Sequence, residues 1–389
     1  MTESQPQLHN NTVSYTRGKT LGGSSALNEM PYQRRTVGSY HAWADAVGDE
    51  RWNFTNLLPF FEKSVKYTAP NARIRAASAF VPSTSSDLSS TEGLLHVSFP
   101  NYAAPFSSSS EASFLDDAFA RNELFPNLAV HIHTLGGKII FNTNKTATGV
   151  LVKSNGFLHL LNATKEVIIS AGAFQSPQLL TVSGIGPKAE LEKHNITVIA
   201  DRPSVGQNIS EAKADLATFP ADWLDFEYVV LSFNSSTYLA SNITYGTLEP
   251  ALIDPLSRGN ISVSSPSIDD PPIINVGWLT NATNLETAVI AIKRAREFWA
   301  SDVMKGILVG EEVLPGKNVS TDEQILEWAR GHVRTVYHAS CTCKMGKVED
   351  EMAVTDSRAR VIVVNNLRVV DASTFRCCRR DILRVLSMP

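Results

Sequence analysis

A chain of 389 residues with 43% hydrophobic and 19% charged residues is long enough to bury a sizeable core in one large or two joined domains. The net charge of −4 and the pI near 6.2 argue against a nucleic-acid surface, and no apolar run approaches the roughly 18 residues of a membrane helix. Residues 1–15 are polar and lack the apolar stretch of a signal peptide, so the chain as written is expected to be cytoplasmic.

Asparagines in N-x-S/T sequences recur along the chain and favour descent from a glycosylated, secreted protein. They are Asn10, Asn53, Asn144, Asn162, Asn195, Asn208, Asn234, Asn242, Asn260, Asn281 and Asn318. Because such triplets also arise by chance in cytosolic proteins, they leave the cellular location open.

The cysteines lie close together near the end of the chain, at positions Cys341, Cys343, Cys377 and Cys378. They are too few and too bunched for a disulfide framework. Their C-x-C and C-C spacings also lack the usual gaps between metal ligands. We therefore expect packing or incidental thiols, and no metal site.

The first third of the chain alternates loops with short helices, and residues 76–91, rich in Ser, Ala and Pro, predict a surface excursion. Apolar runs then predict strands over 128–132, 138–141 and 147–152, with a turn over 142–145 between the last two. This region is typical of a β-meander.

A strand, a turn and a helix are predicted next. Residues 166–170 form a short apolar strand that runs into the small residues of 171–173. Ser176 and Pro177 supply an N-cap and a first-turn proline for a helix that Gly184 ends. This local geometry brings backbone N–H groups toward an anionic cofactor.

The second half mixes strands and helices. Residues 228–233 and 259–264 alternate like strands of an antiparallel sheet. Apolar residues at helical spacing predict a helix over 285–299, and Thr321 with Gln324 forms a capping box for another helix. A separate domain built on an antiparallel sheet follows from these elements.

Near the C-terminus, residues 359–364 and 367–370 flank Asn365 and Asn366, a pair that tolerates positive φ and predicts a tight hairpin. Asp371 follows the second strand, where ligands often bind in α/β sheets. No internal repeat and no G-x-G-x-x-G sequence occurs anywhere in the chain.

Three segments carry the chemistry. Residues 17–35 read R-G-K-T-L-G-G-S-S-A-L-N-E-M-P-Y-Q-R-R, and residues 172–186 read G-A-F-Q-S-P-Q-L-L-T-V-S-G-I-G. Residues 336–374 contain Y-H-A-S-C-T-C-K-M-G and V-D-A-S-T. Taken one at a time, each segment also has an ordinary structural interpretation: the first as a Gly-Ser loop, the second as a capped helix and His338 in the third as a core histidine. Together they resemble the signatures of the glucose-methanol-choline (GMC) family of FAD oxidoreductases, in its fungal branch.

The resemblance implies an α/β fold of the GMC type with two discontinuous domains. The FAD-binding α/β domain would comprise residues 1–30, 107–205 and 338–389. The substrate domain, α+β with an antiparallel sheet, would comprise residues 31–106 and 206–337.

The resemblance also implies the functional residues. His338 would act as the base that takes the alcohol proton while hydride passes to the flavin. The residues implied to contact FAD are Gly22, Gly23, Ser24, Asn28, Gly172, Ala173, Asp371 and Ala372. His332 has no counterpart in the motif and is expected to be structural. The partners would be a small alcohol and dioxygen or another electron acceptor, with no nucleic acid and no membrane.

The sequence departs from the family pattern in places that bear on activity. Without a G-x-G-x-x-G turn, the first βαβ unit and its pyrophosphate site are missing, so weak FAD binding is expected. Stretches near 107–111 and after Asn208 are shortened, and Val363 and Asn366 replace hairpin glycines. The segment 376–381 stands where the family has a second catalytic residue.

These departures favour a truncated and impaired alcohol oxidase or dehydrogenase, from a lineage of fungal secondary metabolism. One alternative is a redox-neutral dehydrative cyclase, a reaction that this scaffold can also host. Another is a non-catalytic remnant. Family members are typically secreted, which is at odds with the absence of a signal peptide here.

Overall fold

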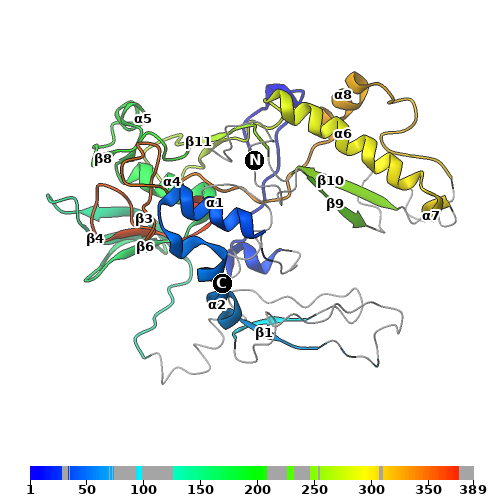
Figure 1. The fold of residues 1–389 in the computed structure, drawn as a ribbon. Coiled ribbons are helices and arrows are strands. Elements are labelled where there is room, and N and C mark those ends of the chain that lie inside the picture. The colour runs from blue at the N-terminus through cyan, green and yellow to red at the C-terminus, as the bar shows by residue number, and fades with distance from the viewer. Residues whose placement is uncertain are drawn as a thin grey trace.

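The structure is a computed structural model that describes residues 1–28, 34, 36–69, 71, 73, 93–98, 126–207, 226–231, 246–252, 255–305 and 310–375. The predicted excursion over 76–91, the shortened stretches near 107–111 and after Asn208, and the tail from residue 376 lie outside these residues. In Figure 1, β3 (Thr134–Phe141) and β4 (Ala147–Ser154) lie at one end of the molecule. Helices α6 (Ala282–Trp299) and α8 (Asp322–His332) lie at the other end.

The N-terminal helices pack through aromatic side chains. Helix α1 (Val37–Val47) buries Tyr40 and Trp43 almost completely, and it is followed by η3 (Glu50–Trp52) and α2 (Phe54–Ser64). Phe375, near the other end of the chain, packs edge-on against Trp43 with ring centroids 5.5 Å apart. This contact joins helix α1 to the C-terminal end of the described residues. The remaining short elements here are η1 (Pro6–Leu8) and the parallel pair β1 (Val65–Tyr67) and β2 (Leu95–Val97).

A three-stranded antiparallel sheet in the order β3–β4–β5 forms the predicted meander, with β5 at Phe157–Asn162. Strands β3 and β4 and the turn between them confirm the predictions for 138–152. The predicted strand over 128–132 is wrong, since that segment contains only turns and irregular chain. Leu128, Val130 and Ile132 are exposed there. The apolar residues of this segment are therefore not buried in a sheet, as the prediction of a strand had assumed.

Strands β6 (Val167–Ile169) and β13 (Leu367–Val369) pair in parallel, although they lie far apart along the chain. Strand β6 was predicted, and β13 is the second arm of the predicted hairpin. The two strands pair because this places their apolar side chains in one shared core. The buried residues of the pair are Val167, Ile169, Leu367 and Val369.

The prediction of a tight hairpin is wrong in its first arm, because residues 359–364 form no strand. An isolated antiparallel bridge between Arg360 and Arg368 is what links this segment to β13. Val363 and Asn366, at the positions where glycines were expected, have φ of +76° and +56°. The backbone thus keeps the left-handed conformation that favours glycine, although neither residue is one.

Helix α4 (Gly172–Val182) follows β6 directly, and most of its residues are buried. The helix was predicted, but its start was not: Ala171 is the N-cap and Pro177 lies inside the helix. Gly184 follows the helix end with φ of +94°, the left-handed conformation that terminates helices. The elements that continue this layer are β7 (Ile185–Gly186), α5 (Lys188–Lys193) and β8 (Ala200–Asp201).

Within the described residues, the second half contains two antiparallel pairs rather than one continuous sheet. Helix α6 covers the predicted helical stretch, and α8 begins with the predicted capping box, in which Thr321 and Gln324 exchange hydrogen bonds. In the part of the chain that the structure describes, no helix is long and apolar enough to cross a membrane. The elements here are β9 (Phe226–Leu231) with β10 (Thr247–Leu252), β11 (Asn260–Ser262) with β12 (Ile273–Asn275), and α7 (Asp302–Lys305).

The cysteines differ from the expectation. Cys341 is disulfide-bonded, so it is not an incidental thiol. Cys343 is a free, fully buried thiol, and burial raises its pKa well above the usual range. The expectation that the cysteines are free thiols is therefore confirmed for Cys343 and wrong for Cys341. Sequence spacing did not reveal this disulfide, because the tertiary fold determines which cysteines come close enough to bond.

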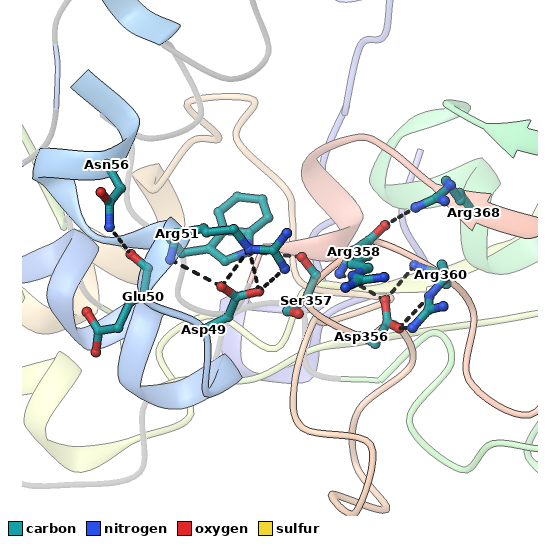
Figure 2. Close-up of polar contacts among 10 residues, drawn as sticks. Asp49, Glu50, Arg51, Asn56, Asp356, Ser357, Arg358, Arg360 and Arg368 are labelled. Carbon is teal, nitrogen blue, oxygen red and sulfur yellow. Dashed lines mark hydrogen bonds and ion pairs between the residues drawn. The ribbon is translucent and has the colours of Figure 1, made fainter. Parts of the chain in front are cut away.

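Asp49 connects η3 to the loop that precedes β13, and Asp356 holds that loop together from within (Figure 2). Asp49 accepts hydrogen bonds from the side chain of Arg51, at 2.9 Å, and from Ser357. The Arg51 hydrogen bond holds the pKa of Asp49 far below its usual range. Asp356 in turn accepts from Nε of Arg360 at 2.7 Å. Through Ser357, which bonds to Asp49 and accepts a hydrogen bond from Nε1 of Trp52 at 3.0 Å, η3 is connected to the C-terminal part of the chain.

Asp356 should make stability depend on pH. Burial alone raises its pKa, but hydrogen bonds from the Arg360 side chain and from the backbone of Arg358 and Arg360 outweigh burial, so the pKa lies below its usual value. Its contribution is therefore present above about pH 4, the unfolded value, and lost as the pH falls further. We expect Asp356→Asn to lower the free energy of unfolding by about 2 kcal/mol at pH 7.

Urea unfolding followed by circular dichroism measures this difference. The difference in free energy of unfolding between the wild type and Asp356→Asn should become smaller as the pH falls below about 4, because the wild-type carboxylate is then protonated. Asp302→Asn is the matched control, because Asp302 pairs with Lys305 on the exposed surface. If the difference in free energy of unfolding between the wild type and Asp356→Asn stayed constant down to the pH of acid unfolding, the prediction would be contradicted.

Candidate functional site

The candidate site begins at the edge of the β6–β13 pair, where two loops meet because parallel strands end on the same side. Asp371 lies there, just beyond β13. One of its carboxylate oxygens accepts from the backbone N–H of Gly172, at 2.8 Å, and from the hydroxyl of Ser176, at 2.5 Å. The other accepts from the backbone of Ser373 at 2.8 Å. Asp371 thus joins the second and third motifs.

Residues 341–345 run alongside the short turn η7 (Ala372–Thr374) and are held to it by backbone hydrogen bonds. The hydroxyl of Thr342 also donates to the carbonyl of Ala173, at 2.7 Å. Gly172, Ala173, Asp371 and Ala372 therefore lie in one neighbourhood. The backbone bonds run from Cys341 to Ala372 at 3.1 Å, from Cys343 to Ser373 at 2.8 Å and from Met345 to Thr374 at 2.8 Å.

His338 stands at the start of this segment. It is half-buried, whereas residues 339–346 that follow it are buried. Tyr337, immediately before it, has φ of +64° and is exposed. The histidine therefore lies at the boundary between the core and the surface, next to the residues that Asp371 and Thr342 bring together.

The glycine-rich motif reaches the same neighbourhood through Arg17. Nη1 of Arg17 donates to the carbonyl of Tyr337 at 2.7 Å. Gly18 packs against the turn that starts η2 (Gly23–Ala26): a Cβ at Gly18 would lie only 2.1 Å from the carbonyl oxygen of Gly23. The backbone N–H of Gly18 also donates to the hydroxyl of Ser24 at 3.2 Å.

The backbone at two predicted cofactor contacts fits a large planar ligand. Gly23 and Gly172 have φ of +56° and +82°, and a Cβ on either would point into open space. Gly22 is also left-handed, at +79°, Ser24 is exposed and Asn28 is half-buried. A flavin approaching these turns would meet main-chain atoms instead of side chains.

Sequence reasoning did not select three residues that the structure places at the site. Ser176 was assigned to a helix cap, but its hydroxyl bonds to Asp371. Tyr15 and Arg17 lie beside Phe174 and Tyr337. Arg17 opens the first motif, which was the available signal, whereas Tyr15 carries none because its contacts with Phe174 and Tyr337 are distant in sequence.

Comparison with known proteins identifies the family. Residues 4–212 and 255–378 match the N- and C-terminal models of the GMC oxidoreductases. Patulin synthase of Aspergillus clavatus is 37% identical, over 93% of this chain and 74% of its own. Versicolorin B synthase of Aspergillus parasiticus is 32% identical, over 96% of this chain and 73% of its own. The chain belongs to the GMC oxidoreductase family, and this membership implies FAD as the cofactor.

Solved structures confirm the GMC fold. An FAD-dependent oxidoreductase from Chaetomium thermophilum superposes with a TM-score of 0.83 at 21% identity, covering 99% of this chain and 87% of the other. A fungal aryl-alcohol oxidase superposes with a TM-score of 0.79 at 19% identity, covering 100% and 87%. The alignment with the A. clavatus enzyme spans 468 positions, more than the 389 residues here, so that relative has stretches without a counterpart in this chain.

Proposed function

We propose that the protein oxidises a small alcohol with FAD as the hydride acceptor and His338 as the base. The convergence of the motifs carries this proposal: Asp371 bonds to Gly172, Thr342 bonds to Ala173, and Arg17 bonds to the residue before His338. Family membership supports the reaction class. Dioxygen or another acceptor then takes the electrons.

In this proposal each part of the site has one task. His338 takes the hydroxyl proton of the alcohol, which a neutral imidazole can do near neutral pH. FAD supplies the acceptor for the hydride from the alcohol carbon. The residues that hold FAD are Gly22, Gly23, Ser24, Asn28, Gly172, Ala173, Asp371 and Ala372.

The division into domains is part of the same proposal. Strands β3, β4, β6 and β13 and helix α4 share one apolar core, which supports a cofactor-type domain over 1–30, 107–205 and 338–389. Helix α6 contacts both α8 and strand β10, which supports a substrate-type domain over 31–106 and 206–337.

Redox-neutral dehydrative cyclisation is the second candidate, because the relatives include versicolorin B synthase. Anaerobic mixing of the flavin-loaded protein with alcohols separates the two. Bleaching of the oxidised flavin absorbance supports oxidation. Conversion of a substrate with unchanged absorbance supports cyclisation, and the absence of both supports a non-catalytic remnant.

We expect the 389-residue polypeptide by itself to bind FAD weakly and to turn over slowly. The sequence contains no G-x-G-x-x-G turn for the pyrophosphate, so only the flavin-side contacts contribute to binding. The flavin-to-protein ratio after gel filtration, read from absorbance, measures the affinity. A stoichiometric flavoprotein would contradict the expectation of weak binding.

Glycosylation in a secretory host is expected to follow exposure. The exposed acceptors should be modified, whereas Asn53 and Asn281 should not, because their side chains cap α2 and α6. Glycopeptide mass spectrometry maps the sites, with bacterially expressed protein as the unmodified control. Full occupancy of Asn53 would count against this expectation. The exposed acceptors among the described residues are Asn10, Asn144, Asn162, Asn195, Asn260 and Asn318.

A further inference from the structure

A cluster of aromatic rings surrounds the guanidinium of Arg17. Its central carbon lies 4.6 Å from the ring centroid of Tyr15 and 4.9 Å from that of Phe174. The Tyr15 and Phe174 rings meet edge-to-face at 4.9 Å. Phe174 is 2% exposed and belongs to α4, so the guanidinium is held against a rigid helix.

The same guanidinium reaches the backbone next to His338. Arg17 donates to the carbonyl of Tyr337, and Tyr15 packs edge-on against the Tyr337 ring at 5.8 Å. The backbone N–H of Tyr337 donates to the hydroxyl of Thr335 at 2.7 Å. Both backbone polar groups of Tyr337 thus bond to side chains.

Tyr337 needs such support because of its conformation. Its φ of +64° is unfavourable for a bulky residue and persists only where neighbouring contacts impose it. If the contacts were lost, the backbone would relax toward a right-handed or extended conformation. The direction of the next side chain, His338, would change with it.

We propose that Tyr15 and Arg17 form a brace that fixes the backbone of Tyr337 and thereby orients the imidazole of His338. Arg17 is in this sense a positioning residue. The role of the orientation rests on the proposed function of His338, but the brace itself can be measured without turnover.

Hydrogen–deuterium exchange at the imidazole C2 position, read by mass spectrometry, reports on each histidine separately. In Arg17→Met, the backbone of Tyr337 loses one hydrogen bond from a charged donor, so conformations that expose the His338 ring become more populated. The exchange rate at C2 of His338 should therefore rise by about tenfold. Arg17→Lys keeps a charged donor but loses the planar stack, so it should restore part of the protection. His332 serves as the internal reference, and Arg294→Met, at an exposed ion pair, as the control variant.

A double-mutant cycle guards against a general loss of stability. Asparagine adopts positive φ more readily than tyrosine, so a Tyr337→Asn protein depends less on the contacts of Arg17. In that background, Arg17→Met should therefore change the exchange rate of His338 less than it does in the wild type. Unchanged His338 exchange in a folded Arg17→Met protein would overturn the brace. If Arg17→Met accelerates exchange while His338→Ala leaves turnover of the FAD-loaded enzyme intact, the brace stands and the proposed base fails.

Discussion

Replacing His338 by alanine should lower the turnover of the FAD-loaded enzyme with alcohol substrates by about 10²- to 10⁴-fold, the usual contribution of a positioned base. His338 is half-buried and directly precedes the buried segment 339–346, and in the proposed function its imidazole is the proton acceptor that the substitution removes. Alcohol-dependent flavin reduction under anaerobic conditions, followed by stopped-flow absorbance, measures the rate.

His332→Ala is the matched control. The ring of His332 stacks on Trp328 at 4.3 Å, and its Nδ1 lies 2.7 Å from the carbonyl oxygen of the same residue. These contacts lie within one turn of α8 on the exposed surface, so the substitution should leave turnover within about twofold of the wild type. Equal losses from the two substitutions would refute the assignment of His338.

Replacing Asp371 by alanine should destabilise the fold by about 3 kcal/mol, because a partly buried carboxylate that accepts several hydrogen bonds is lost. The affected donors are the backbone of Gly172 and Ser373 and the hydroxyl of Ser176. Asp371→Asn keeps the shape but loses one acceptor oxygen, so its stability should lie between those of the wild type and Asp371→Ala. Urea unfolding at pH 7 measures the free energies.

Asp269→Ala is the control for this effect. Asp269 pairs with Lys153 at 2.9 Å on an exposed surface, and such pairs contribute at most about 1 kcal/mol. If Asp371→Ala and Asp269→Ala cost the same, the link between β6, α4 and η7 does not depend on the carboxylate. Retained FAD affinity in a folded Asp371→Ala protein would separately argue against its role as a cofactor contact.

The sequence by itself determined the elements that depend on neighbouring residues. The capping box of Thr321 and Gln324 forms within a single turn, and the strands β3 and β4 close around a short turn. The family motifs also identified Gly172, Asp371 and His338 as candidate residues before their arrangement was known. Such features are local or are carried by the motif itself.

Only the tertiary structure decided how distant segments meet. The pattern around Asn365 and Asn366 favoured two hairpin strands, yet β13 pairs with β6 because the parallel pair shares a buried core with α4. The contact of Arg17 with Tyr337 likewise joins segments from opposite ends of the chain. Such contacts arise from the collective packing of the core, which no local sequence pattern specifies.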